Sequence, residues 1–127
     1  MIVLDTHVWV WWASEPDRLT PPQREALASE AEIGVSAISC WEVAKLVERG
    51  RLDLDRPVLD WLRAALAYPG VHLVGITPEV AAESASLPGE FHRDPADQLL
   101  VATARVRQCR LATSDRRIVE YAHVETV

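Results

Sequence analysis

The chain opens with Met1-Ile2-Val3-Leu4-Asp5, an apolar run that ends at a carboxylate. A short, continuous apolar run is typical of a strand that is buried on both faces of a parallel sheet. Asp5 would then lie at the carboxyl end of this strand, where open α/β sheets form their ligand crevice. A carboxylate beside an apolar strand is costly to bury unless it is paired or coordinated. This segment therefore indicates both a fold class and a functional site.

The rest of the chain alternates apolar segments with segments that start at helix-capping residues. We expect strands over residues 2–5, 33–36, 72–76 and 110–113, and an edge strand over 123–127. We expect helices over residues 6–13, 21–31, 39–49, 57–67, 78–87, 95–106 and 116–122. Thr20, Ser39 and Asp94 are the predicted N-caps of three of these helices. The alternation predicts a mainly parallel sheet with helices on both faces.

Length and composition narrow the class of protein. A chain of 127 residues is long enough for one domain with a real core but too short for two, so we expect a single domain over 1–127. The longest apolar stretch, Val8 to Ala13, is far short of a membrane span, and no cleavable signal precedes it. We therefore expect a cytoplasmic protein with no membrane contact. Cys40 and Cys109 lack metal-ligand spacing and are expected to be packing residues.

The charge balance argues against broad electrostatic adhesion to nucleic acid. The formal net charge is −6, and such adhesion needs many cations that face phosphates. The positions of individual arginines are more informative than the total. Arg93 precedes Asp94, and Arg116 and Arg117 follow Asp115, so they place positive charge beside the acids. All three are candidates for phosphate contacts, and a solvated surface role is the alternative.

Four acids are predicted to meet at one edge of the sheet. Asp5 and Asp115 follow expected strands, and Glu42 and Asp97 lie about one turn into expected helices. Each of the last three has a structural alternative, because Glu42 fits a capping box with Ser39, and Asp97 and Asp115 fit helix-end or turn roles. Taken together, four close carboxylates repel one another and raise one another's pKa unless a cation is present. Carboxylate oxygens are the ligands that Mg²⁺ and Mn²⁺ prefer, so the pattern outlines a metal site.

Four blocks of sequence resemble, in order and spacing, the signature blocks of the PIN-domain ribonucleases, and most closely those of the VapC toxins. The blocks are Met1-Ile2-Val3-Leu4-Asp5-Thr6-His7, Ser36-Ala37-Ile38-Ser39-Cys40-Trp41-Glu42-Val43-Ala44, His92-Arg93-Asp94-Pro95-Ala96-Asp97-Gln98-Leu99-Leu100-Val101-Ala102-Thr103-Ala104 and Leu111-Ala112-Thr113-Ser114-Asp115. They span essentially the whole chain. Departures from the family pattern are His7, where asparagine is common, and Gln98, where arginine is frequent.

The resemblance implies a three-layer α/β/α PIN domain with a mainly parallel central sheet, acting as an Mg²⁺- or Mn²⁺-dependent endoribonuclease. It also implies an RNA substrate, a cognate VapB-like antitoxin and a homodimer. The metal ligands and catalytic acids that it implies are Asp5, Glu42, Asp97 and Asp115, with Asp94 competing for the role of Asp97. Thr6 and Ser114 flank these acids and are expected to hold them through hydrogen bonds.

Two other functional classes compete with a nuclease. A catalytically silent PIN scaffold that binds RNA or protein would be favoured by the loss of one acid, yet all four are present. A response-regulator receiver would show adjacent acids after its first strand, whereas Thr6 and His7 follow Asp5 here. The sequence therefore favours the nuclease.

Overall fold

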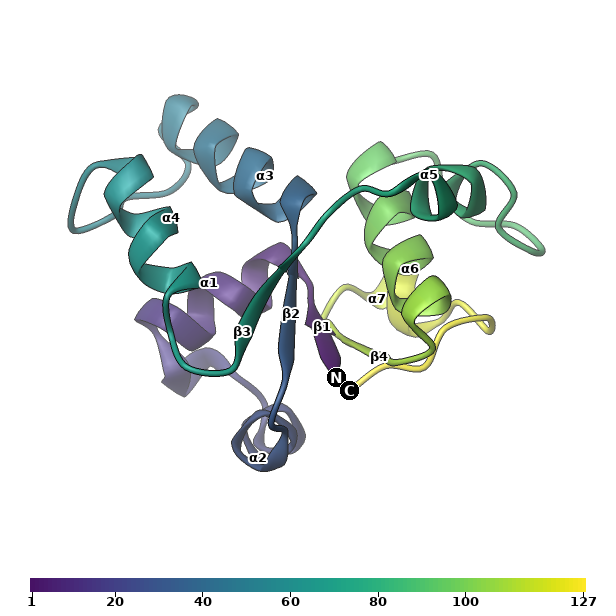
Figure 1. Cartoon of the computed structure of the whole chain (residues 1–127), viewed down its shortest axis with the longest axis horizontal. Coiled ribbons are helices and arrows are strands. Elements are labelled where there is room, and N and C mark those ends of the chain that lie inside the picture. The colour runs from purple at the N-terminus through teal and green to yellow at the C-terminus, as the bar shows by residue number, and fades with distance from the viewer.

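The computed structural model describes all 127 residues and contains a four-stranded, all-parallel sheet between two layers of helices (Figure 1). The strands are β1 Ile2–Leu4, β2 Ile33–Ser36, β3 Val71–Val74 and β4 Arg110–Ala112, in the order β3-β2-β1-β4. The prediction of a three-layer α/β/α fold with a parallel sheet is confirmed.

The helices divide between the two faces of the sheet (Figure 1). One layer holds α1 Thr6–Ser14, α2 Pro21–Ser29, α3 Ala37–Glu48 and α4 Val58–Leu66, with a 3-10 turn at Pro16–Arg18. The other layer holds α5 Pro78–Ser84, α6 Pro95–Arg107 and α7 Arg116–Val119. No helix is long and apolar enough to cross a membrane.

Strand β1 supplies side chains to both hydrophobic cores. Ile2 and Leu4 belong to the core beneath α1 to α4, whereas Val3 belongs to the core beneath α6 and α7. This alternation follows from the two-residue period of a strand, and it is why the opening apolar run is unbroken. In the parallel register Leu4 lies opposite Val35 on one side and Ala112 on the other. The carboxyl ends of β1, β2 and β4 therefore lie side by side.

The predicted N-caps of α2 and α6 are confirmed, but the predicted cap of α3 is wrong. Thr20 accepts a hydrogen bond from Gln23 N, and Asp94 accepts from Ala96 N and Asp97 N. The cap of α3 is Ser36, which accepts from Ile38 N, because β2 leads into α3 without a loop. Ser39 is instead a buried helix residue. Glu42 is therefore six residues into α3 and has no capping-box partner at Ser39.

The predicted edge strand over 123–127 is also wrong. This segment forms only an isolated bridge, between Leu111 and Thr126. Backbone bonds from Leu111 N to Glu125 O and from Thr113 N to Val127 O still hold it beside β4. Residues 122–124 form a turn, so only residues 125–127 run beside β4. Cys40 and Cys109 are half-buried free thiols, in agreement with packing roles.

Leu4 tests the importance of the β1 register for stability. Leu4→Ala leaves a cavity in the core between the sheet and helices α1 to α4, and should lower the free energy of unfolding by about 2–5 kcal/mol. The exposed Leu59 on α4 is the matched control, and Leu59→Ala should change it by less than about 0.5 kcal/mol. Urea denaturation measures both variants. Equal midpoints for Leu4→Ala and the wild type would contradict the central role of β1.

Candidate functional site

A pocket of about 370 Å³ opens at the carboxyl ends of the strands and is lined mostly by acids. All four acids singled out from the sequence line it, although they are up to 110 residues apart in the chain, Asp5 and Asp115 being the outermost. Parallel pairing of β1 with β2 and β4 brings them together, as expected of strand ends in an open sheet. The full lining is Asp5, His7, Trp11, Glu42, Asp94, Asp97, Ser114, Asp115 and Arg117.

Asp5 stands at the N-cap position of α1 without acting as a cap. Its side chain makes no hydrogen bond to the helix end and instead accepts one from Thr113 Oγ1 at 2.7 Å. Burial of the carboxylate raises the pKa of Asp5, and the bond from Thr113 offsets part of that rise. A capping role would not require this burial. Asp5 is therefore an acid that the fold directs into the pocket.

Glu42 is held by Thr6, one residue beyond Asp5. Thr6 Oγ1 lies 2.6 Å from Glu42 Oε1 and 2.9 Å from Ser39 Oγ. This contact joins the start of α1 to the second turn of α3. Burial raises the pKa of Glu42, whereas the hydrogen bond from Thr6 lowers it. Thr6 therefore has the positioning contact that was expected of it.

The pKa of Asp97 is strongly raised. Burial, followed by the negative charges of Asp94 and Asp5, raises the pKa of Asp97 to about 7. Asp94 is exposed and caps α6 through Ala96 N at 2.9 Å and Asp97 N at 3.2 Å. The two acids thus differ in kind, because Asp94 has a structural bond to the backbone and Asp97 is a buried carboxylate that faces other acids.

Asp115 is the one acid of the four whose pKa is lowered. Arg117 causes this, because its Nη2 lies 3.0 Å from Asp115 Oδ2 and its Nε lies 3.3 Å from Oδ1. Asp115 Oδ1 also accepts a bond from Arg117 N at 2.9 Å as the N-cap of α7. Asp115 is therefore a helix cap, which was one of its two interpretations from the sequence. The same side chain also lines the pocket.

The remaining predicted residues lie farther from the acids. Ser114 lines the pocket, but its Oγ accepts a bond from Gln23 and contacts no carboxylate. Arg116 is 88% exposed and pairs with Glu120 at 3.1 Å. Arg93 is exposed and does not line the pocket. The arginine that does reach the acids is Arg117.

Three polar residues at the site carry no recognisable sequence signal. Thr113 bonds Asp5 and also accepts from Asp115 N at 3.1 Å. Gln23 Nε2 lies 3.2 Å from Thr113 O, 3.2 Å from Ser114 Oγ and 3.3 Å from Val127 O, which ties α2 to the loop after β4. The Thr113-Ser114-Asp115 block had drawn attention only to its last two members. Gln23 also completes the capping box with Thr20, which accounts for it locally.

His92 is the third of these residues. Its Nε2 is buried without a hydrogen-bond partner, and it lies 3.1 Å from Asp97 Oδ2. Its Nδ1 accepts a bond from Asp94 N at 3.3 Å. This bond places the proton of a neutral ring on Nε2, on the side of Asp97. The absence of any ligand spacing among the histidines had set His92 aside.

The comparisons with known proteins agree with this geometry. The family model described as "PIN domain" matches residues 2–124. Ribonuclease VapC22 of Mycobacterium tuberculosis is 44% identical over 126 residues, which is 99% of this chain and 95% of that protein. The chain belongs to the PIN-domain family, and within it to the VapC group.

Two solved structures extend the likeness beyond sequence. FitAcB from Neisseria gonorrhoeae is 26% identical with a TM-score of 0.65, over 99% of this chain and 96% of that one. VapBC2 from Rickettsia felis, bound to a DNA fragment from its promoter, is 16% identical with a TM-score of 0.71, over 100% of this chain and 98% of that one. The second likeness concerns the fold alone.

The donors of this PIN pocket suit a hard divalent cation. They are carboxylate oxygens, and burial raises the pKa values of Asp5, Glu42 and Asp97. No three of the His, Cys, Asp or Glu side chains approach one point closely enough to hold an ion. Hydroxyl groups and Arg117 contact the acids. The fit to a divalent ion therefore rests on the chemistry of the donors.

The raised pKa values predict how the metal-free PIN domain responds to pH. Asp97 has a pKa of about 7 when folded, against an ordinary value of 3.8, so the folded state binds its proton more tightly. Its contribution to stability is therefore full at low pH and is lost as the pH rises towards about 7. In EDTA, Asp97→Asn should become progressively more stable relative to the wild type between about pH 4 and pH 7, with no further change above that range.

Thermal melts across this pH range provide the measurement. Asp60→Asn, which removes an exposed carboxylate from α4 outside the pocket, controls for the loss of one charge. A constant stability difference between Asp97→Asn and the wild type at all pH values would show that Asp97 is not perturbed.

Proposed function

We propose that this chain acts as a single PIN domain over residues 1–127 and is an Mg²⁺- or Mn²⁺-dependent endoribonuclease toxin that a cognate antitoxin neutralises. The observation that carries the proposal is the pocket in which Asp5, Glu42 and Asp97 are brought together with raised pKa values. The relative named Ribonuclease VapC22 supports the activity. The proposal places the protein in the cytoplasm, where RNA and Mg²⁺ are available.

Asp5 and Asp97 are the proposed principal metal ligands, and Asp115 is the proposed ligand at a second or outer position. A divalent ion held there would supply Lewis-acid chemistry and charge neutralisation at the phosphate. Glu42 is placed to orient a water molecule or to accept its proton, because Thr6 Oγ1 holds Oε1 at 2.6 Å beside the pocket. Ser114 and Asp94 border the substrate space, and His7 and Trp11 line its wall.

RNA is the proposed substrate, and cations around the pocket are its proposed phosphate contacts. The acidic pocket repels a polyanion on its own, so binding needs both the metal ion and nearby guanidinium groups. Arg93 and Arg116 adjoin the lining residues Asp94 and Asp115 and point a positive charge to solvent. They suit the backbone on either side of the cleaved bond, and not the scissile phosphate itself.

Removing one carboxylate charge tests the catalytic proposal. Asp5→Asn and Asp97→Asn keep the shape of the side chain but not the charge that the cation needs. Each should lower Mn²⁺-dependent cleavage of an RNA oligonucleotide by more than about 100-fold, the upper end of the loss caused by outer-shell changes. Gel assays with Mn²⁺ and with EDTA measure it, and Asp60→Asn is the control. Full, chelator-insensitive cleavage by either Asp variant would refute the mechanism.

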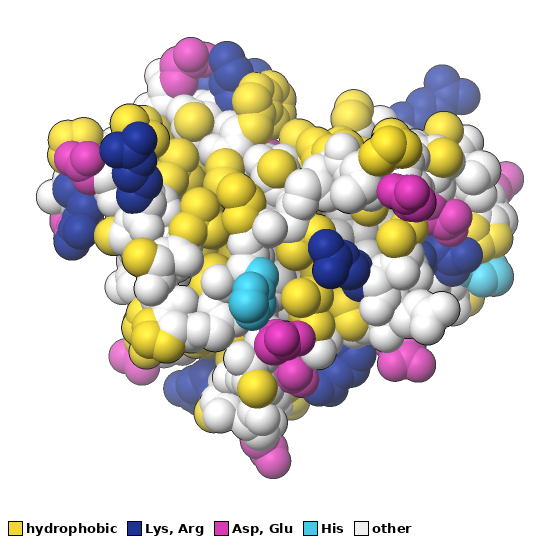
Figure 2. All heavy atoms as spheres, viewed as in Figure 1, with side chains coloured by type: hydrophobic (Ala, Val, Ile, Leu, Met, Phe, Trp, Pro, Cys, Tyr) yellow, Lys and Arg dark blue, Asp and Glu magenta, His cyan; other side chains and the backbone are white.

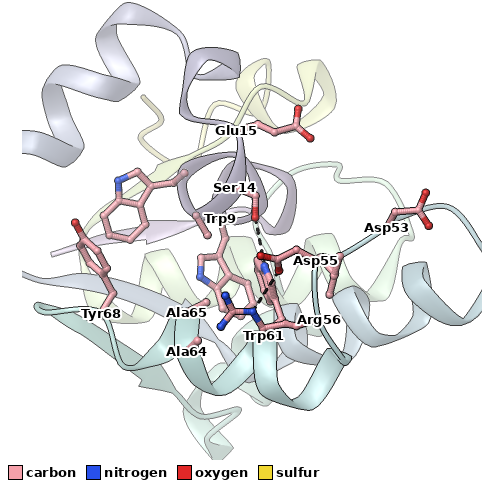
Figure 3. Close-up of a pocket in the computed structure, with 13 residues that line it drawn as sticks. Trp9, Ser14, Glu15, Asp53, Asp55, Arg56, Trp61, Ala64, Ala65 and Tyr68 are labelled. Atoms are coloured by element: carbon pink, nitrogen blue, oxygen red, sulfur yellow. Dashed lines mark hydrogen bonds and ion pairs between the residues drawn. The ribbon is translucent and has the colours of Figure 1, made fainter.

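A groove between α1 and α4 is the proposed antitoxin site (Figure 3). Its volume is about 650 Å³, and Trp9 and Trp61 pack edge to face within it at 5.1 Å. Glu15, Asp53 and Asp55 surround the groove, which favours an amphipathic helix with basic flanks. The resemblance to the VapC toxins implies that the antitoxin also inserts an arginine among the carboxylates, where its guanidinium would form bidentate hydrogen bonds.

A homodimer is the proposed assembly, formed through the apolar side chains around the edge strand β3. Figure 2 shows hydrophobic side chains gathered near the notch between the two helical layers and over the middle of this face. Leu73 on β3, Ile76 after it and Trp41 on α3 are exposed. Trp41 lies on α3, the helix that also carries Glu42. Two copies would also double the arginines that face RNA.

Partner binding is testable at the groove. Ala64 is exposed on α4 and lines the groove. Ala64→Arg should therefore lower the affinity for the antitoxin tail by at least about tenfold, because the larger side chain blocks the groove. Ala82→Arg on α5 adds the same side chain to the opposite helical layer and should leave the affinity unchanged. Calorimetric titration measures both, and light scattering reports the dimer. Equal affinities for the two variants would show that the antitoxin binds elsewhere on the protein. A stable monomer that cuts RNA would contradict the proposed homodimer.

A further inference from the structure

Arg117 occupies the acidic pocket as an internal counter-ion. Its Nη2 lies 3.0 Å from Asp115 Oδ2 and 3.4 Å from Asp97 Oδ2, so one guanidinium bridges two of the acids. The neighbouring Arg116 makes no such contact and pairs with Glu120 on the surface. The guanidinium of Arg117 is therefore the one arginine group in the pocket, and it lies between two proposed ligands of the metal ion.

The contacts of Arg117 neutralise only part of the pocket. They lower the pKa of Asp115, whereas Asp97 keeps a raised pKa despite the same guanidinium. The side chain of Arg117 is 59% exposed, so its charged head can leave the acids without disturbing the core. Its backbone is held separately, because Arg117 N donates to Asp115 Oδ1 at the start of α7. An exchangeable counter-ion needs a charged group that can move while its backbone stays in place, and Arg117 meets this requirement.

A divalent cation and this guanidinium compete for the same oxygens. An ion bound by Asp97 and Asp115 would stand close to a positive charge, and like charges at such a separation repel. A freed guanidinium has a planar set of donors that matches two oxygens of a phosphate. The released head would remain at the mouth of the pocket, beside any phosphate that the metal ion attracts.

We propose that Arg117 is a displaceable substrate-positioning residue: it occupies the carboxylates in the metal-free protein, and metal binding releases it to bind the RNA phosphate at the pocket. This inference rests on the proposed function and deepens it. It couples metal loading to substrate binding, since the arginine becomes available only when the cation has taken its acids.

Metal binding tests the competition without any reference to cleavage. Calorimetric titration of Mn²⁺ into EDTA-stripped wild type, Arg117→Gln and Arg116→Gln gives three affinities. Arg117→Gln should bind Mn²⁺ about tenfold more tightly than the wild type, because no guanidinium has to be displaced. Arg116→Gln removes an equal charge from the adjacent position and should remain within about twofold of the wild type. Arg117→Lys, which keeps the charge without the planar fork, should lie between the wild type and Arg117→Gln.

RNA binding tests the release. In saturating Mn²⁺, Arg117→Gln should raise the KM for an RNA oligonucleotide by roughly fivefold, since a charge-assisted phosphate contact is lost. In EDTA, the same variant should bind the labelled oligonucleotide as the wild type does, measured by fluorescence anisotropy, because Arg117 is then occupied by the acids. Melting curves in EDTA check that each variant is folded.

The outcomes separate this inference from the function on which it rests. Equal or weaker Mn²⁺ binding by Arg117→Gln would overturn it, and would identify Arg117 as a permanent brace for Asp115. An equal loss of RNA binding with and without Mn²⁺ would also overturn it, because release would then play no part. In both cases a wild type that binds Mn²⁺ and cuts RNA leaves the proposed function intact. A wild type that takes up no Mn²⁺ would overturn both.

Discussion

The pairing of β1 with two parallel neighbours at once is the constraint on which the rest of the molecule depends. Leu4 lies opposite Val35 and Ala112, so three strands end together at one edge of the sheet. A slip of one residue would exchange the faces of Ile2, Val3 and Leu4 and expose each to the wrong core. The packing of these apolar side chains thus fixes the position of every acid that follows a strand end.

Concentrating carboxylates at that edge has an electrostatic cost that the fold only partly offsets. Thr113, Thr6 and Arg117 each contact one or more of the acids, yet burial keeps the pKa values of three of them raised. A scaffold that served only for binding would gain nothing from this repulsion, because uncharged residues of similar size would pack there more favourably. The retained acids therefore weigh against a catalytically silent PIN domain and in favour of a site that takes up a cation.

The same electrostatic logic links the proposals on metal, substrate and antitoxin. A divalent ion, the guanidinium of Arg117 and an arginine of a bound antitoxin are alternative cations for one set of oxygens. In these proposals each cation would have a different consequence: the ion would support hydrolysis, Arg117 would occupy the acids until the ion binds, and an arginine of the antitoxin would block the site. The groove around Trp9 and Trp61 then provides the apolar contacts that an arginine alone would lack.

The sequence by itself determined the layered parallel fold, the near-complete set of elements and the meeting of the four acids. It could do so because parallel strands joined by helices always place their carboxyl ends on the same edge, whatever the details of packing. Local chemistry was sufficient for the caps at Thr20 and Asp94. It failed for α3, where Ser36 and Ser39 are equally good caps in isolation and only the end of β2 decides between them.

Tertiary structure alone decided which polar residues serve the acids. Arg117 reaches Asp97 and Arg116 does not, because adjacent residues on a helix point about 100° apart and the orientation of α7 selects one of them. His92 and Gln23 reach the site through contacts with residues that no local pattern connects to them. The segment 123–127 forms only one bridge, because the chain turns over residues 122–124 and leaves three residues beside β4. Contacts of this kind depend on how elements pack, and packing is set by the whole chain at once.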